Sequence, residues 1–145
     1  ITGILVITTP QDVASNVAVK AVSMFEKLNV PIIGVIENMS HFICPKCDDK
    51  HYIFGNGGAK KISEQFKIPF LGEIPLNYGI MSGSDSGKPI MNTNTDSPSA
   101  EAFRASAKNV AAQCSIIASN LQEEMESESG ESESSDEDST NNGTS

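Results

Sequence analysis

Two cysteines separated by two residues are the part of this sequence best suited to chemistry. Cys44 and Cys47 flank Pro45-Lys46 within a polar stretch. This spacing lets both sulfurs turn toward one metal centre, and the Lys46 ammonium is expected to favour the thiolates that bind metals and iron–sulfur clusters. Because a metal centre usually has four ligands, the pair supplies half of a set.

The other ligands of such a centre can come from more than one arrangement. His41 or His51 could join the cysteines in an intramolecular zinc site. A redox-active pair is a second alternative, but such a pair opens a helix, and Asp48-Asp49 does not favour one here. Two thiolates from each of two chains are a third arrangement, which suits a bridging cluster. The odd count of three cysteines favours metal or redox use in a reducing compartment over a disulfide scaffold.

A second group of polar residues follows the apolar runs of the chain. Asn38 comes after one such run, at the edge where open α/β sheets place ligands. Its amide offers a donor and an acceptor to a base edge, or it caps a turn. Thr8, Thr9 and Asp12 occupy the equivalent position after an earlier run, where turn formation and helix capping are expected.

Two glycine-rich segments imitate a phosphate-binding loop without matching it. Residues 83–89 contain a Gly-Lys pair, but Pro89 stands where a magnesium-binding hydroxyl is required, and the gap between the glycines is one residue short. Residues 55–60 also lack the pattern. Neither segment is a Walker A motif, and both are expected to form turns or a helix start.

Alternating strands and helices must position these groups. Short apolar runs predict buried strands over residues 4–8, 32–36 and 70–74. A helix between the first two strands is predicted from the spacing of Val13, Val17, Ala21, Met24 and Leu28. A crossover of that length favours parallel strands packed against the helix. The predicted fold class is therefore α/β, with an incomplete parallel sheet.

The remaining segments are predicted to form loops and two further helices. Residues 38–58 lack sustained periodicity and are expected to be a functional loop, followed by a short helix over residues 59–66. Residues 76–98 are expected to be a long irregular connection. A long amphipathic helix is predicted from Phe103, Ala107, Val110, Cys114, Ile117 and Leu121. Cys114 is expected to be a core residue of that helix.

Composition divides the chain into two parts. The net charge of -9 comes largely from residues 122–145, which also have no apolar face, so a disordered tail is expected after one domain over residues 1–121. The domain lacks a basic stripe, which disfavours nucleic-acid binding. Because no apolar run approaches the roughly 20 residues that a bilayer requires, no membrane partner is expected.

Five segments in this order closely resemble the Mrp/ApbC family of iron–sulfur cluster carriers, whose P-loop ATPase fold is related to the MinD and ParA proteins. They are Thr8-Thr9-Pro10-Gln11-Asp12-Val13-Ala14, Val35-Ile36-Glu37-Asn38-Met39-Ser40, Cys44-Pro45-Lys46-Cys47, Ile53-Phe54-Gly55 and Leu71-Gly72-Glu73-Ile74-Pro75-Leu76. The resemblance continues through residues 84–89 and Ser97-Pro98, and so covers about residues 3–115.

The resemblance implies a carrier that passes a cluster to apoproteins. Cys44 and Cys47 would meet the same pair in a homodimer or related heterodimer and hold a bridging 4Fe–4S cluster, with apo iron–sulfur proteins and scaffold proteins as partners. Asn38 would contact adenine, and Pro75 and Leu76 would lie near the nucleotide. Residues 1–121 would be the C-terminal half of a P-loop ATPase domain.

This sequence departs from the family in one large respect. The Walker A lysine loop, the magnesium-binding hydroxyl and the switch aspartate of the family would precede Thr2. We therefore expect ATP and Mg²⁺ to bind mainly through a preceding N-terminal half, and this chain alone to be inactive as an ATPase, although its full-length parent hydrolyses ATP.

Two other functions are compatible with these residues. One is a zinc-stabilised interaction module that uses Cys44, Cys47 and His41 or His51. The other is a MinD-like positioning ATPase, which should end in an amphipathic membrane-targeting helix; the acidic tail argues against it. A cytoplasmic location is expected, or a mitochondrial or plastid one if a leader lies upstream.

Overall fold

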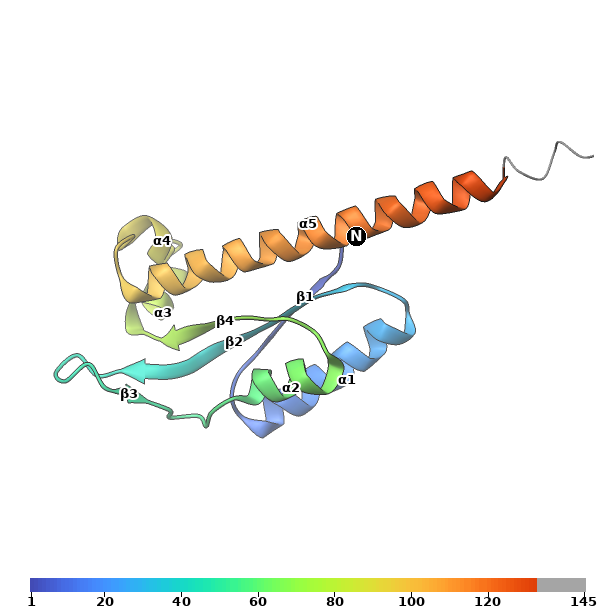
Figure 1. Cartoon of the computed structure of the whole chain (residues 1–145). Helices are drawn as coiled ribbons and strands as arrows, with labels where there is room; N and C mark the ends of the chain where they lie inside the picture. Colours follow the sequence, from blue (N-terminus) through green and yellow to red (C-terminus); the bar gives the residue numbers. More distant parts are fainter. Residues whose placement is uncertain (133–145) are drawn as a thin grey trace, which may run out of the picture.

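A parallel sheet forms the centre of the molecule. The computed structural model of the chain describes residues 1–132. Strands β1 (Ile4–Thr8) and β4 (Phe70–Leu76) both run parallel to β2 (Ile32–Ile43). Because both pair with residues 35–37 of β2, they lie on its two sides, and β2 is the central strand (Figure 1). The predicted α/β class with parallel strands is confirmed.

Strand β2 runs further than the sequence pattern predicted. The short strand β3 (Lys50–His51) pairs antiparallel with its end, so that β2 and β3 form a hairpin. The predicted loop over residues 38–58 is therefore wrong for residues 38–43. Pairing with β3 and β4 satisfies the backbone there. The apolar signal is missing because the polar side chains of Ser40 and His41 are themselves buried.

Helices cover both faces of the sheet (Figure 1). Helices α1 (Asp12–Lys27) and α2 (Gly58–Phe66) pack on one face, and α5 (Pro98–Ser132) packs on the other. The first face buries Val6, Ala18, Val22, Val35, Ala59 and Ile62. The second face buries Ile33, Ile36, Leu71 and Ile74. This two-sided cover is what a parallel sheet needs to remove its apolar surface from water.

The face of α1 that packs on the sheet differs from the predicted one. The helix buries Ala18 and Val22, whereas Val13 is 79% exposed and Val17 is 65% exposed. The helix has apolar residues on two faces, and periodicity alone does not tell which one meets the sheet. Asp12 lies in the first turn, where the helix dipole favours its negative charge. Gln11 occupies the cap position, but its side chain accepts the Thr9 hydroxyl at 2.7 Å instead of an N–H of the helix.

The predicted irregular connection after β4 contains two short helices, α3 (Tyr78–Asp85) and α4 (Ile90–Thr93). The Asn77 side chain caps α3 by accepting the N–H of Gly79 at 2.7 Å. Inside α3, Ser84 donates its hydroxyl to a carbonyl one turn earlier. Such local side-chain bonds let glycine- and serine-rich sequence form helix that propensity disfavours.

Helix α5 continues beyond the end that its apolar spacing predicted. Val110, Cys114 and Ile117 pack against the core, which confirms these three residues of the predicted face, whereas Phe103 and Leu121 are exposed. Residues 122–132 are also helical, so the predicted disorder does not begin at residue 122. Glutamate, glutamine and methionine are good helix formers without tertiary contacts. Residues 133–145 lie outside the described part of the chain. In residues 1–132, no helix combines the length and apolarity needed to cross a bilayer.

Candidate functional site

The two cysteines lie at the tip of the β2–β3 hairpin. The backbone N–H of Cys44 donates to the carbonyl of Asp49 at 3.0 Å, and the N–H of Asp48 donates to the carbonyl of Cys44 at 2.9 Å. Asp48 closes the turn in the left-handed region at φ 57°, which Asp tolerates better than most residues. Cys44 is half-buried and Cys47 is exposed, so the pair is accessible from outside the fold.

His51, rather than His41, lies with the cysteines. The ligand atoms of Cys44, Cys47 and His51 all lie within 4.8 Å of one another. His41 is buried on β2, where its Nδ1 is 2.7 Å from the Ser40 hydroxyl and 3.9 Å from a Glu73 carboxylate oxygen. The sequence offered both histidines as possible metal ligands. Of the two, only His51 is placed to bind the same metal ion as the cysteine pair.

The hairpin tip favours the thiolate form of Cys44. Hydrogen bonds from the backbone N–H of Lys46, then from that of Cys47, and then from the Cys47 side chain lower the pKa of the Cys44 thiol. Desolvation and the charge of Asp48 oppose this shift and are smaller. The backbone of Lys46, rather than the ammonium that the sequence suggested, is thus the group that stabilises the thiolate.

A buried carboxylate supports the base of the hairpin and was not predicted from the sequence. Glu37 on β2 is only 1% exposed, and its carboxylate accepts the N–H of Ala59 at 2.9 Å in the first turn of α2. A carboxylate is favourable there because the helix dipole is positive at that end. The sequence feature that could have revealed this buried carboxylate is its place directly after the five-residue apolar run over residues 32–36.

A neighbouring ion pair extends this support across the sheet. Glu73 stands opposite Glu37 in the parallel pairing of β4 with β2. Its carboxylate lies 3.1 Å from the Lys60 ammonium of α2, and the hydrogen bond and charge of Glu73 raise the pKa of Lys60. Glu37 and Glu73 therefore hold α2 against β2, whose end forms the hairpin, and against its neighbour β4.

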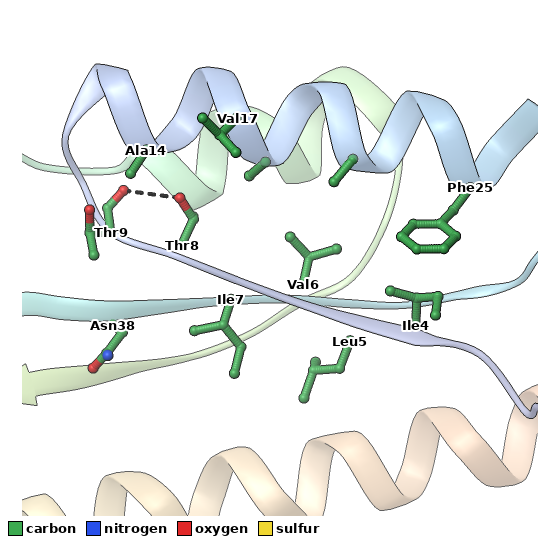
Figure 2. Close-up of a pocket in the computed structure, with 12 residues that line it drawn as sticks. Ile4, Leu5, Val6, Ile7, Thr8, Thr9, Ala14, Val17, Phe25 and Asn38 are labelled. Carbon is green, nitrogen blue, oxygen red and sulfur yellow. Dashed lines mark hydrogen bonds between the residues drawn. The ribbon is translucent and has the colours of Figure 1, made fainter.

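Asn38 lies where two grooves meet at the carboxyl end of the sheet. One groove, of about 600 Å³, runs between β1 and α1 and is also lined by Thr8 and Thr9. Figure 2 shows Asn38, Thr8 and Thr9 at the same end of this groove. The other groove, of about 620 Å³, runs between β1 and α5. Asn38 is thus accessible from both faces of the sheet.

The backbone beside Asn38 is unusual. Its Oδ1 accepts the N–H of Met39 at 2.9 Å, and Met39 has φ 53°, in the left-handed region. The pairing of β2 with β4 is irregular between Asn38 and Phe42. A non-glycine residue in this conformation costs about 1–2 kcal/mol, and such strain gathers at functional positions.

Pro75 and Leu76 lie apart from the two grooves. They line a smaller cavity of about 270 Å³ beneath the hairpin, together with Ile43 and Pro45. Asn38 is opposite Ile74 instead, one residue before Pro75 along β4. The structure thus places Asn38 beside Thr8 and Thr9, and places Pro75 and Leu76 under the cysteine loop.

The free edge of β1 is an uncovered apolar region beside these grooves. Among residues 1–132, β1 pairs with β2 alone. Its Ile7 is 60% exposed, and Val13 and Val17 of α1 are exposed beside it. An unpaired parallel edge with apolar neighbours presents backbone groups ready for another strand.

Known proteins share both the sequence and the fold of this chain. The profile of the NUBPL iron-transfer P-loop NTPase family, within ParA, matches residues 1–111. The iron-sulfur cluster transfer protein NUBPL of Dictyostelium discoideum is 46% identical over 117 residues, which are 81% of this chain and 36% of that protein.

Two solved structures resemble this chain. A nucleotide-binding protein from Archaeoglobus fulgidus, in complex with ADP and with Co, is 36% identical, with a TM-score of 0.53 over 60% of this chain and 36% of that one. The cell division ATPase MinD of Pyrococcus furiosus has a TM-score of 0.55 at 23% identity, over 73% of this chain and 40% of that one, and shows a shared fold.

The resemblance to P-loop iron–sulfur carriers is thereby confirmed at the level of family and fold. The match covers the parallel sheet, both helical layers and the cysteine hairpin, since it spans residues 1–111. The chain spans about a third of the length of the curated relatives it matches. From this coverage and identity, the chain belongs to the NUBPL family of iron-transfer P-loop NTPases.

Proposed function

We propose that this chain is the cluster-holding part of an iron–sulfur cluster carrier, which passes its cargo to apoproteins. The observation that carries the proposal is the cysteine pair at the exposed tip of a hairpin, with Cys44 predisposed to be a thiolate. The similarity to the iron–sulfur cluster transfer protein of Dictyostelium discoideum supports it.

The cargo would be shared between two chains. Each chain offers the thiolates of Cys44 and Cys47, and a cluster of the 4Fe–4S type takes four. A second copy, or a related chain with the same pair, supplies the other two. The hairpin tip is suited to this because it projects from the sheet and Cys47 is exposed. An accessible cluster between two tips is also open to attack by the thiols of an apoprotein.

Nucleotide binding is proposed for the full-length protein. Asn38 lies beside Thr8 and Thr9 at the carboxyl edge of the parallel strands, where this class of sheet binds ligands. The Archaeoglobus structure, which holds ADP, supports nucleotide binding by the full-length protein. The residues that hold phosphates and Mg²⁺ have no counterpart in this sequence, so we assign them to a further part of the protein and assign no catalytic residue here.

Strand β2 gives a physical route between nucleotide and cluster. Asn38 and Cys44 lie on one continuous segment, with the strained Met39 between them. If the hairpin has two positions and a nucleotide contacts Asn38 in only one of them, nucleotide binding shifts the population toward that position. Two hairpins that separate or approach would then hold the bridging cluster less or more tightly.

Anaerobic reconstitution tests the proposal. Protein incubated with iron and sulfide is expected to gain the visible absorbance of a cluster, with one cluster per two chains. Replacing both Cys44 and Cys47 by serine should abolish that absorbance. The matched control is Cys114→Ala, which removes the third thiol from α5 and should leave the cluster intact. A cluster that survives in the double serine variant would overturn the proposal.

A further inference from the structure

A third donor at the hairpin tip is not used by a bridging cluster. His51 lies with Cys44 and Cys47 so closely that the three ligand atoms are within 4.8 Å of one another. The four thiolates of a shared cluster come from two chains and require no histidine. The proximity of His51 therefore needs a separate physical account.

The hairpin brings the three donors together from both of its arms. Cys44 directly follows β2, and His51 sits on β3 opposite Phe42. The bonds between Cys44 and residues 48 and 49 close the loop and place Cys47 on the same side. Both arms are anchored in the sheet, so the convergence follows from strand pairing rather than from a free loop.

The distances suit a single ion. Zinc binds sulfur at about 2.3 Å and imidazole nitrogen at about 2.0–2.1 Å, so donors on one tetrahedral ion are roughly 3.5–4 Å apart. The donors here lie within 4.8 Å. Cys47 and His51 are exposed, so small side-chain rotations can close the difference without displacing buried atoms.

The charges also suit a soft divalent ion. Two thiolates and a neutral imidazole balance one divalent cation. Around them, Lys46 and Lys50 offset Asp48 and Asp49. Sulfur and imidazole ligands favour zinc-type ions over Mg²⁺ or Ca²⁺, which prefer oxygen.

We propose that Cys44, Cys47 and His51 of one unpaired chain bind a single zinc-type divalent ion, with the fourth coordination position open. This inference rests on the proposed carrier function in one respect: both use Cys44 and Cys47. The ion-bound single chain and the cluster-bound pair are then alternative states of one hairpin. His51 is a ligand in the first state and is released in the second.

Cobalt titration of the full chain tests the site, because tetrahedral Co²⁺ with thiolate ligands is coloured. The background is Cys114→Ala, so that only Cys44 and Cys47 carry thiols. We expect one Co²⁺ per chain, with tetrahedral d–d bands and thiolate charge transfer. The variant His51→Gln should weaken binding at least about 100-fold. The matched control Lys50→Gln, one residue earlier on β3, should bind as the parent does, and His51→Cys should restore tight binding.

Two outcomes overturn this inference: His51→Gln binding Co²⁺ as tightly as the parent, or one Co²⁺ held by two chains. Reconstitution with iron and sulfide in parallel separates the two proposals. A cluster that forms in His51→Gln leaves the carrier function standing whether or not His51 binds cobalt. Failure of the parent to form a cluster while it still binds one Co²⁺ per chain would overturn the carrier function alone.

Discussion

The carboxylate of Glu37 accepts the backbone N–H of Ala59 from 2.9 Å, which joins the middle of β2 to the first turn of α2. Glu37 is buried, and its neighbour Asn38 lies at the ligand edge of the sheet. Seven residues after Glu37 the chain reaches Cys44. The contact therefore fixes the strand that connects the proposed nucleotide edge with the cysteine hairpin.

Removal of that contact is expected to destabilise the fold. Glu37→Ala leaves the Ala59 N–H without its acceptor and opens a cavity, so the free energy of unfolding should fall by roughly 2–4 kcal/mol in urea titrations. Glu37→Gln keeps an acceptor oxygen and should lose less. The control Glu64→Ala, an exposed site on the same helix, should change stability by less than about 0.5 kcal/mol. Equal effects at both positions would show that the buried contact contributes nothing.

The strands and the cysteine pair were predictable from the sequence for simple reasons. The runs over residues 4–8 and 32–36 are short, apolar and rich in branched residues, which suits strands buried on both faces. The run over residues 70–74 contains Glu73 but lies between Pro69 and Pro75, which mark its ends. All three are strands in the structure. The spacing of Cys44 and Cys47 is a local property of the sequence, so it predicts metal binding without knowledge of the tertiary packing.

The hairpin and the site around it were not predictable in the same way, because they form through contacts between residues far apart in the sequence. Residues 38–43 form strand because β3 and β4 pair with them, and their buried Ser40 and His41 interrupt any apolar alternation. The choice between His41 and His51 as a ligand rests on which strand face each occupies. Periodicity also selected the wrong face of α1, because Val13 and Val22 are both apolar yet only Val22 meets the sheet.

Close packing between β4 and α5 predicts coupling between Gly72 and Ser106. A Cβ built on Gly72 would lie 2.2 Å from the Ser106 hydroxyl oxygen, and Gly72 has φ 155°. Gly72→Ala should therefore cost about 3 kcal/mol of folding free energy. The Ser106 hydroxyl is buried and finds no hydrogen-bond partner among residues 1–132, so Ser106→Ala alone should be neutral or stabilising.

A double-mutant cycle in urea measures this coupling. The pair Gly72→Ala and Ser106→Ala should recover part of the loss, because the clashing oxygen is gone, with a coupling energy of about 1 kcal/mol or more. Strictly additive effects would contradict the proposed close contact. Gly87→Ala is a useful comparison, since within residues 1–132 its added Cβ has no atom within 4 Å apart from Gly87 and its two chain neighbours. Its cost therefore reflects backbone conformation alone.

His41 predicts a loss of stability in mild acid. Burial, and then the charge of Lys50, lower its pKa from the ordinary value of 6.5, while Glu73 and Glu37 oppose the shift. The unfolded chain therefore takes up the proton first. The contribution of neutral His41 is present above pH 6.5 and is lost as pH falls from there toward the folded pKa.

Unfolding free energies at a series of pH values between 7.5 and 5 test this sign. His41→Gln should lower stability at pH 7.5, because the Ser40 contact changes, but should flatten the dependence on pH below 6.5. If the variant keeps the same slope as the parent, His41 is not the group responsible.

Cys44 is expected to react as a thiolate at lower pH than an ordinary cysteine. The N–H groups of Lys46 and Cys47, followed by the Cys47 side chain, lower the pKa of its thiol. Alkylation of the metal-free chain by iodoacetamide, resolved by residue in mass spectrometry, should give a midpoint for Cys44 below the usual value of about 8.5. The variant Cys47→Ala removes only the side-chain donor, so the Cys44 midpoint should rise part of the way. A midpoint at or above the usual value in the parent would mean that the hairpin backbone does not stabilise the thiolate.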